Sequence, residues 1–126
     1  MSEHVRVENA GGVLSIALAR PERRNAITVA MYAALADALE AAAADPAIRL
    51  IRISGDGQDF TAGNDLADFL SGPPRDVGEI PVWRMLRALA SCATPILGQV
   101  HGNCVGIGTT MLLHCDLVVA EDGARF

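Results

Sequence analysis

Two glycine-rich segments contain residues that could do chemistry through their backbone. They are FTAGNDL at residues 60–66 and HGNCVGIGTT at residues 101–110. Each follows an apolar run typical of a strand and leads toward a helix. A strand that turns sharply into a helix leaves the first N–H groups of that helix without acceptors. Two such turns side by side could direct two N–H groups at one oxygen and stabilise an enolate or a tetrahedral anion.

A third segment, RPERRNAIT at residues 20–28, precedes these two. All three, in this order, resemble the landmarks of the crotonase superfamily, which includes enoyl-CoA hydratases and isomerases. The resemblance implies an α/β protein with the ClpP/crotonase spiral of ββα units, and an enzyme that acts on acyl-CoA thioesters. It implies no permanently bound cofactor and no metal, since coenzyme A arrives as part of the substrate.

The resemblance also assigns roles to individual positions. It places the two oxyanion donors at the backbone amides of Ala62 and Ile107, and Thr110 where the family's hydratases carry a glutamate that helps to activate water. A threonine hydroxyl cannot replace a carboxylate as general base at neutral pH. We therefore expect the chain to favour double-bond isomerisation, which needs a single acid, over hydration.

Substrate contacts implied by the resemblance surround these donors. The segment at residues 20–28 lies against the nucleotide end of coenzyme A in the family, where a guanidinium could meet phosphate; taken alone, its arginines indicate a solvated loop. Asp65 could be a catalytic acid, but its place before a helix favours an N-cap. The implied contacts are Arg24, Ala26, Ala62, Gly63, Asn64, Asp65, Leu66, Gly106 and Ile107.

Other residues with metal-binding or nucleophilic side chains give weaker signals. His101 and His114 have no further ligand at useful spacing, so a metal or general-base role is disfavoured. The cysteines are three in number and form no CxxC pair, which argues against a disulfide framework or a zinc site. We expect them to be buried thiols.

Composition excludes two classes of partner. The formal net charge is −5, from ten basic and fifteen acidic residues, and no basic face is indicated, so we expect no nucleic-acid partner. No apolar run approaches the length of a membrane span, and the first ten residues lack the apolar centre of a signal peptide. We expect a cytoplasmic protein with no membrane partner.

Hydrophobic periodicity predicts the elements that position the three segments. A hairpin turns at Gly11-Gly12, and the longest helix shows apolar residues four apart and ends at Asp45-Pro46. The predicted strands cover residues 5–7, 13–19, 48–54, 96–100 and 117–120, the predicted helices cover residues 29–44, 82–90 and 108–114, and residues 71–74 form a loop.

The resemblance covers about the N-terminal half of a family member. We therefore expect residues 1–126 to be the N-terminal part of a crotonase-fold domain, with the catalytic acid and the helices of a homo-oligomer, a trimer or a dimer of trimers, lying in the absent C-terminal part. A composition that is 51% hydrophobic fits apolar surface buried against another segment or subunit. The alternative is a catalytically silent truncated module that acts through assembly.

Two further classes are disfavoured. A serine peptidase on the related Clp-type fold would need a nucleophilic serine beside the second glycine-rich segment, which holds threonines instead. An RNA-binding role, known for one branch of the family, would need a basic helix that this sequence lacks.

Overall fold

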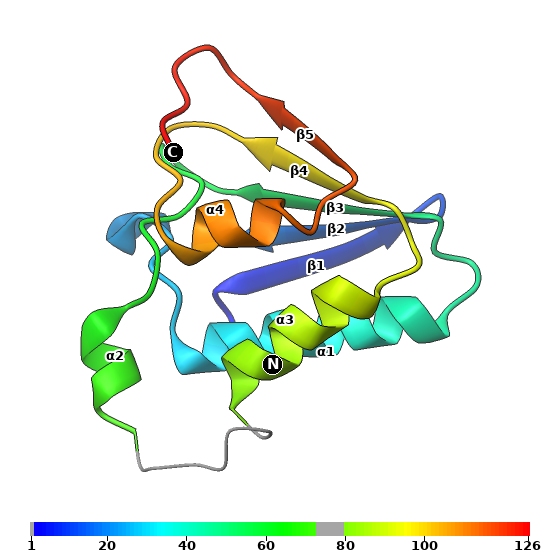
Figure 1. The fold of residues 1–126 in the computed structure, drawn as a ribbon, viewed down its shortest axis with the longest axis horizontal. Helices are drawn as coiled ribbons and strands as arrows, with labels where there is room; N and C mark the ends of the chain where they lie inside the picture. The colour runs from blue at the N-terminus through cyan, green and yellow to red at the C-terminus, as the bar shows by residue number, and fades with distance from the viewer. Residues whose placement is uncertain (1, 73–79) are drawn as a thin grey trace.

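A five-stranded sheet with strand order β1-β2-β3-β4-β5 organises the chain (Figure 1). The computed structural model describes residues 2–72 and 80–126. The strands are β1 (Val5–Ala10), β2 (Val13–Leu18), β3 (Leu50–Gly55), β4 (Ile96–Val100) and β5 (Leu117–Ala120). The helices are η1 (Pro21–Arg23), α1 (Val29–Ala44), α2 (Leu66–Leu70), α3 (Pro81–Ser91) and α4 (Ile107–Leu112).

The β1–β2 hairpin turns where the sequence predicts it. Gly11 and Gly12 have φ angles of 60° and 83°, a combination that glycine adopts readily and that the tight primed turns of hairpins require. The strands on either side pair in antiparallel register from Val5 opposite Leu18 to Ala10 opposite Val13.

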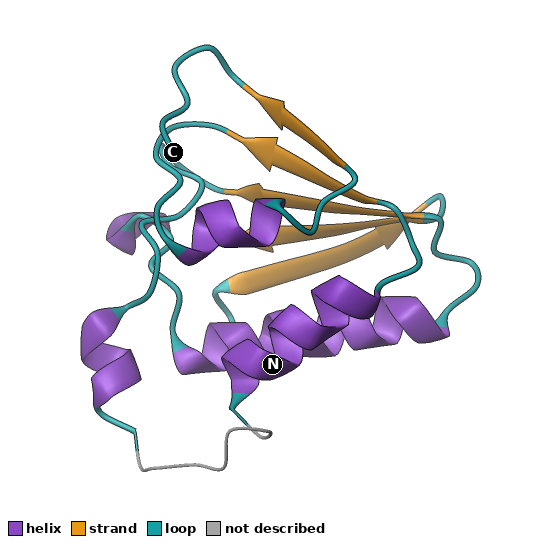
Figure 2. Ribbon diagram, in the orientation of Figure 1, coloured by secondary structure: helices purple, strands orange, loops and turns teal. Residues whose placement is uncertain are grey.

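The remaining strand pairs, β2–β3, β3–β4 and β4–β5, are parallel, so the chain must cross over between successive strands. Helices and loops make these crossings (Figure 2). The carboxyl ends of β2 to β5 all point to the same edge of the sheet, at the left of Figure 1. Parallel α/β sheets bind ligands outside this edge. The segments at residues 20–28, 60–66 and 101–110 follow β2, β3 and β4 at this edge.

Helix α1 supplies much of the core. Thr28 caps it, since the Oγ1 of Thr28 accepts a hydrogen bond from the N–H of Met31 at 3.1 Å. The residues predicted to share one face, Met31, Leu35 and Leu39, are all at most 2% exposed. Helices α1 and α3 run side by side, and Met85 and Leu89 bury the inner face of α3.

Element boundaries differ slightly from the predicted ones. Strand β3 begins at Leu50 rather than residue 48, because the N–H of Arg49 bonds to Gly12 outside the ladder. Helix α4 begins one residue earlier than predicted and ends at Leu112. Trp83 is 47% exposed and therefore does not lie in the core. The predicted loop at residues 71–74 follows α2 at Ser71, and its last two residues fall outside the described ranges.

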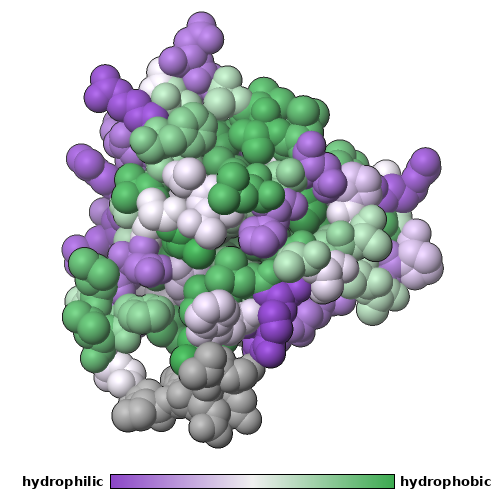
Figure 3. All heavy atoms as spheres, in the orientation of Figure 1, coloured by the Kyte–Doolittle hydropathy of each residue, from purple (hydrophilic) through white to green (hydrophobic). Residues whose placement is uncertain are grey.

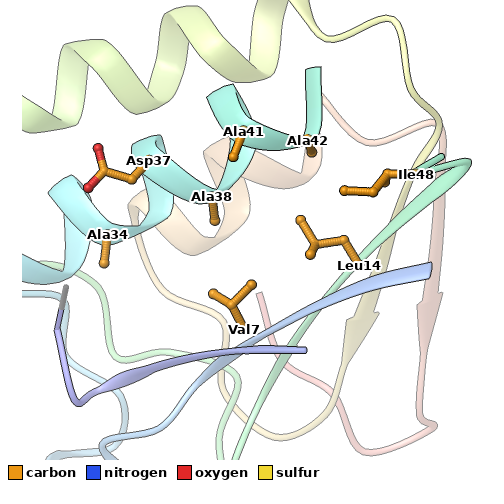
Figure 4. Close-up of a pocket in the computed structure, with 8 residues that line it drawn as sticks. All are labelled: Val7, Leu14, Ala34, Asp37, Ala38, Ala41, Ala42 and Ile48. Carbon is orange, nitrogen blue, oxygen red and sulfur yellow. The ribbon is translucent and has the colours of Figure 1, made fainter. Parts of the chain in front are cut away.

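A cavity of about 270 Å³ lies between α1 and the first two strands (Figure 4). Small alanine side chains of α1 face Val7 and Leu14 across it, with Ile48 at one end and Asp37 on α1. None of the residues that line it belongs to the glycine-rich segments. The cavity is therefore a packing feature of the α1–sheet interface, separate from the candidate site.

Large apolar side chains remain exposed over β5 and α2, where Figure 3 shows hydrophobic atoms at the surface. Every residue of β5 is exposed, which is unusual for a strand of such apolar sequence. The exposed side chains are Leu66, Phe69 and Leu70 on α2, Leu117, Val118 and Val119 on β5, and Trp83, Val105, Leu113 and Phe126 elsewhere. This surface agrees with the expectation of apolar area that another segment or subunit would cover.

Candidate oxyanion site

The two glycine-rich segments lie side by side at the carboxyl edge of the sheet. Thr61 and Cys104 form an isolated parallel bridge between them. The N–H of Thr61 donates to the carbonyl of Asn103 at 3.2 Å, and the N–H of Val105 donates to the carbonyl of Thr61 at 3.0 Å. The juxtaposition expected from the sequence is therefore present, and backbone hydrogen bonds fix its register.

Asn64 and Ile107 each lie three residues beyond the bridged pair in the sequence. Each also follows a glycine with positive φ, 91° at Gly63 and 59° at Gly106. Within the described residues, neither the N–H of Asn64 nor that of Ile107 donates to any acceptor. Ile107 is the first residue of α4, where an amide has no partner inside the helix. Two unpaired amides thus occupy equivalent places on adjacent turns.

The backbone amide of Ala62, expected to be the first oxyanion donor, already donates a hydrogen bond within the chain. The N–H of Ala62 donates to the carbonyl of Arg24 at 2.9 Å. It cannot hold a substrate oxygen while that bond exists, so the structure does not support the assignment of Ala62 and leaves the amide of Asn64 as the free one. The sequence contains a signal that favours Asn64 over Ala62, because a glycine directly precedes both Asn64 and Ile107.

Asn25 connects the residue 20–28 segment to the first glycine-rich turn. It is 0% exposed and has a φ of 56°, in the left-handed region that asparagine tolerates. Its side-chain amide donates to the carbonyls of Asp56, Asp59 and Phe60, and its Oδ1 accepts the N–H of Arg20. Its own carbonyl accepts the hydroxyl of Thr61 at 2.6 Å. One buried side chain therefore holds both segments together.

Arg20 and Asp65 form a second connection between the same segments. The Nη1 of Arg20 lies 2.7 Å from Oδ2 of Asp65 and donates to the carbonyl of Ala26. The other carboxylate oxygen of Asp65 accepts the N–H of Asp68 at 3.0 Å, which makes Asp65 the N-cap of α2 as expected. The Arg20 guanidinium, followed by the Asp68 amide, lowers the pKa of the Asp65 carboxyl below its ordinary value. A carboxylate held ionised in this way suits a structural role.

Tyr32 is a site residue that sequence analysis missed. It lies on α1, is 1% exposed, and its hydroxyl donates to Oδ1 of Asn64. Burial raises the pKa of the phenol well above its ordinary value, so it remains a neutral donor. Nothing in the helical periodicity of α1 separates this tyrosine from its apolar neighbours, because the contact spans thirty-two residues of sequence.

The side chains near the second turn show no strong base. Thr110 is exposed, and its Oγ1 lies 3.4 Å from the carbonyl of Gly106, a weak contact. The Nε2 of His101 lies 2.6 Å from the carbonyl of Gly57, which ties this ring to the β3 turn. Phe60 is fully buried. Asp116 accepts a hydrogen bond from the N–H of Ile96 at 2.8 Å, which suits a structural role.

Arg23 and Arg24 remain at the surface beside the candidate site. The Arg24 side chain is 74% exposed, and its Nε lies 4.0 Å from a carboxylate oxygen of Asp59. Ala26 is half-buried in the same loop. Leu66, at the start of α2, is 69% exposed. The structure thus brings the implied substrate contacts to one edge of the molecule.

Among the described residues, no group of three or more His, Cys, Asp and Glu side chains could hold a metal ion. Of the cysteines, Cys104 is buried, whereas Cys92 and Cys115 are only half-buried, so the expectation of three buried thiols is met in part. Burial, followed by the charge of Asp116, raises the pKa of the Cys115 thiol to about 11. Across the ranges the structure describes, helices are also too short or too polar to cross a bilayer.

Comparison with known proteins decides the family. The sequence model of the enoyl-CoA hydratase/isomerase family matches residues 8–126, nearly the whole chain. The chain belongs to this family. It is 37% identical over 122 residues to 1,2-epoxyphenylacetyl-CoA isomerase from Escherichia coli strain K12, covering 91% of this chain and 46% of that protein. It is 33% identical to hydroxycinnamoyl-CoA hydratase-lyase from Pseudomonas fluorescens, covering 97% of this chain and 47% of that protein.

The solved structures of this family share the fold. An enoyl-CoA hydratase/isomerase from Pseudoalteromonas atlantica T6c superposes with a TM-score of 0.92 at 45% sequence identity, covering 98% of this chain and 49% of that one. The predicted crotonase fold is therefore confirmed. The chain spans about half the length of the relatives it matches.

Proposed function

We propose that this chain supplies the oxyanion hole and part of the coenzyme A site of an acyl-CoA enzyme, with the amides of Asn64 and Ile107 binding the thioester oxygen. The observation that supports this most directly is the pair of amides without acceptors, each three residues beyond the bridged residues Thr61 and Cys104, in the two neighbouring segments. Fixed N–H donors stabilise charge that develops on an oxygen without reorganising, and each is typically worth about a hundredfold to a thousandfold in rate.

The chemistry follows from where charge develops. Removing a proton from the carbon next to a thioester carbonyl moves negative charge onto the carbonyl oxygen. The two amides would hold that oxygen and lower the free energy of the enolate. A proton returned to a different carbon completes a double-bond isomerisation, so one acid-base group suffices.

Isomerisation is proposed over hydration because Thr110 offers no carboxylate to activate water. Asp65, the acid nearest Asn64 in the sequence, is engaged by Arg20 and by the cap of α2. We therefore place the proton-transferring acid outside these 126 residues, in a region that relatives of about twice this length possess. Assembly into a trimer or a dimer of trimers belongs to the same proposal.

The coenzyme A end of the substrate is assigned to Arg24, with Arg23 beside it. Both are exposed and carry guanidinium groups able to bind phosphate in a bidentate manner. Arg20 is not assigned this role, because its guanidinium is committed to Asp65 and Ala26.

A second candidate, a silent module that acts only through assembly, is favoured by the exposed apolar surface of β5. The two candidates predict different ligand binding. A silent module needs no affinity for a thioester, whereas the oxyanion proposal requires it.

The test is a titration of the ¹⁵N-labelled chain with a 3-oxoacyl-CoA, whose thioester enolises readily, and separately with free coenzyme A. The proposal predicts amide shifts at Asn64 and Ile107 with the thioester only. Assays of 3-enoyl-CoA isomerisation and 2-enoyl-CoA hydration on a full-length protein, which includes the region proposed to hold the acid, then separate the reactions. Hydration without isomerisation would contradict the isomerase assignment, and no response to the thioester would favour the silent module.

A further inference from the structure

The segment that leads into α1 holds the backbone on both sides of Asn64. The carbonyl of Gly63 accepts the N–H of Ile27 at 2.8 Å, and the N–H of Asp65 donates to the carbonyl of Ile27 at 2.9 Å. These two bonds fix the chain on both sides of Asn64. The Gly63 carbonyl and the Asn64 N–H belong to one planar peptide unit and point in opposite directions, so the first bond also directs the Asn64 N–H away from Ile27. Neither bond holds the Asn64 side chain.

The hydroxyl of Tyr32 fixes the side chain. Tyr32 is one turn into α1, and its N–H donates to the carbonyl of the capping residue Thr28 at 3.0 Å. The ring is packed in the core at 1% exposure, so it cannot follow a moving loop. Its hydroxyl, the ring's one polar group, bonds to Oδ1 of an exposed residue in a turn.

We propose that Tyr32 is a positioning residue for the oxyanion hole, in which its hydrogen bond to the Asn64 side chain restrains the turn so that the Asn64 N–H points toward the substrate oxygen. This inference rests on the proposed function. It differs from a general packing role, because loss of the hydroxyl alone would release the turn while the aromatic ring stays in the core.

The experiment compares Tyr32→Phe, Asn64→Ala and the double variant. Each single variant should weaken 3-oxoacyl-CoA binding about fivefold to tenfold, the usual net worth of one hydrogen bond, and leave free coenzyme A binding unchanged. The double variant should lose no more than either single variant, because both remove one interaction. Ile16→Val, which trims the core in β2, serves as the control for a small loss of stability and should not change the affinity ratio of the two ligands.

A second readout judges Tyr32 independently of the ligand. In the free protein, Tyr32→Phe should lower the ¹⁵N order parameter of the Asn64 amide and leave that of Ile107 unchanged. An unchanged order parameter at Asn64, or losses that add in the double variant, would overturn the positioning role. If wild-type protein fails to distinguish the thioester from coenzyme A, the proposed function fails, and the order parameter still decides whether Tyr32 restrains the turn.

Discussion

At the scale of single residues, the candidate site depends on polar side chains that bind backbone groups of other segments. Asn25 satisfies three carbonyls and one N–H from inside the core, and Tyr32 reaches Asn64 from α1. Neither side chain needs to touch a substrate in order to matter. Their hydrogen bonds hold the segment of residues 20–28 and helix α1 against the first glycine-rich turn.

Replacing Asn25 by alanine should be costly. The change leaves several buried carbonyls without a donor and places alanine at a φ of 56°, so we expect a loss of about 3 kcal/mol in the free energy of unfolding. Urea unfolding followed by circular dichroism measures it. Asn9→Ala, an exposed change on β1, is the matched control and should stay within about 0.5 kcal/mol of wild type. Equal effects of the two variants would show that Asn25 does not hold the segments together.

At the scale of elements, helix α2 and the residue 20–28 loop are joined by the Arg20–Asp65 pair. The folded-state pKa of Asp65 is lowered, so this group stabilises the fold fully above the ordinary aspartate pKa of about 3.9. The contribution is lost as the pH falls through the lower folded pKa. The Arg20–Asp65 ion pair between α2 and the residue 20–28 loop should therefore weaken at acidic pH and not at basic pH.

This pH dependence can be isolated with Asp65→Asn, which keeps a capping oxygen but loses the charge. The variant should be less stable than wild type at pH 7, and the difference should shrink steadily as the pH falls below about 4. Urea midpoints over this range give the measurement. A stability difference that stays constant with pH would mean that the ion pair contributes nothing. Asp65→Ala, which removes the cap as well, should be worse at every pH.

Most elements were predictable from local pattern. The four-residue spacing of Met31, Leu35 and Leu39 predicted α1, and Gly11-Gly12 predicted the hairpin. The sequence could not show that the Ala62 amide is already hydrogen-bonded, because its acceptor, the carbonyl of Arg24, lies far away in sequence. The Tyr32 contact was missed for the same reason. Local periodicity reports which face of an element is buried, but not which distant carbonyl a turn amide meets.

At the scale of the whole molecule, apolar strand β5 forms one edge of the sheet with all of its residues exposed. Edge strands present unpaired backbone groups and are prone to associate when they are apolar. Leu117 and Val119 share one face of this strand and are 61% and 52% exposed. This edge of the sheet therefore exposes more apolar side chains than the surface of a soluble monomer usually does.

The double variant Leu117→Lys with Val119→Lys should reduce self-association of the chain and its binding of a hydrophobic dye, with little loss of stability, because neither side chain is buried. Sedimentation velocity and dye fluorescence provide the readouts. Ala43→Lys with Ala44→Lys, at the exposed end of α1, adds the same charge elsewhere and should change neither. If both double variants reduce association equally, net charge rather than β5 is responsible.

The central claim, that the amides of Asn64 and Ile107 bind the thioester oxygen, is tested most directly by removing one amide hydrogen. Ile107 is the first residue of α4, a position where proline is tolerated, and Ile107→Pro removes the N–H that the helix leaves unpaired together with part of a side chain packed against the core. The account predicts that this variant stays folded and binds a 3-oxoacyl-CoA about tenfold to a hundredfold more weakly, with free coenzyme A affinity and the Ile107→Val control unchanged. A folded Ile107→Pro protein that keeps wild-type affinity for the thioester would contradict it.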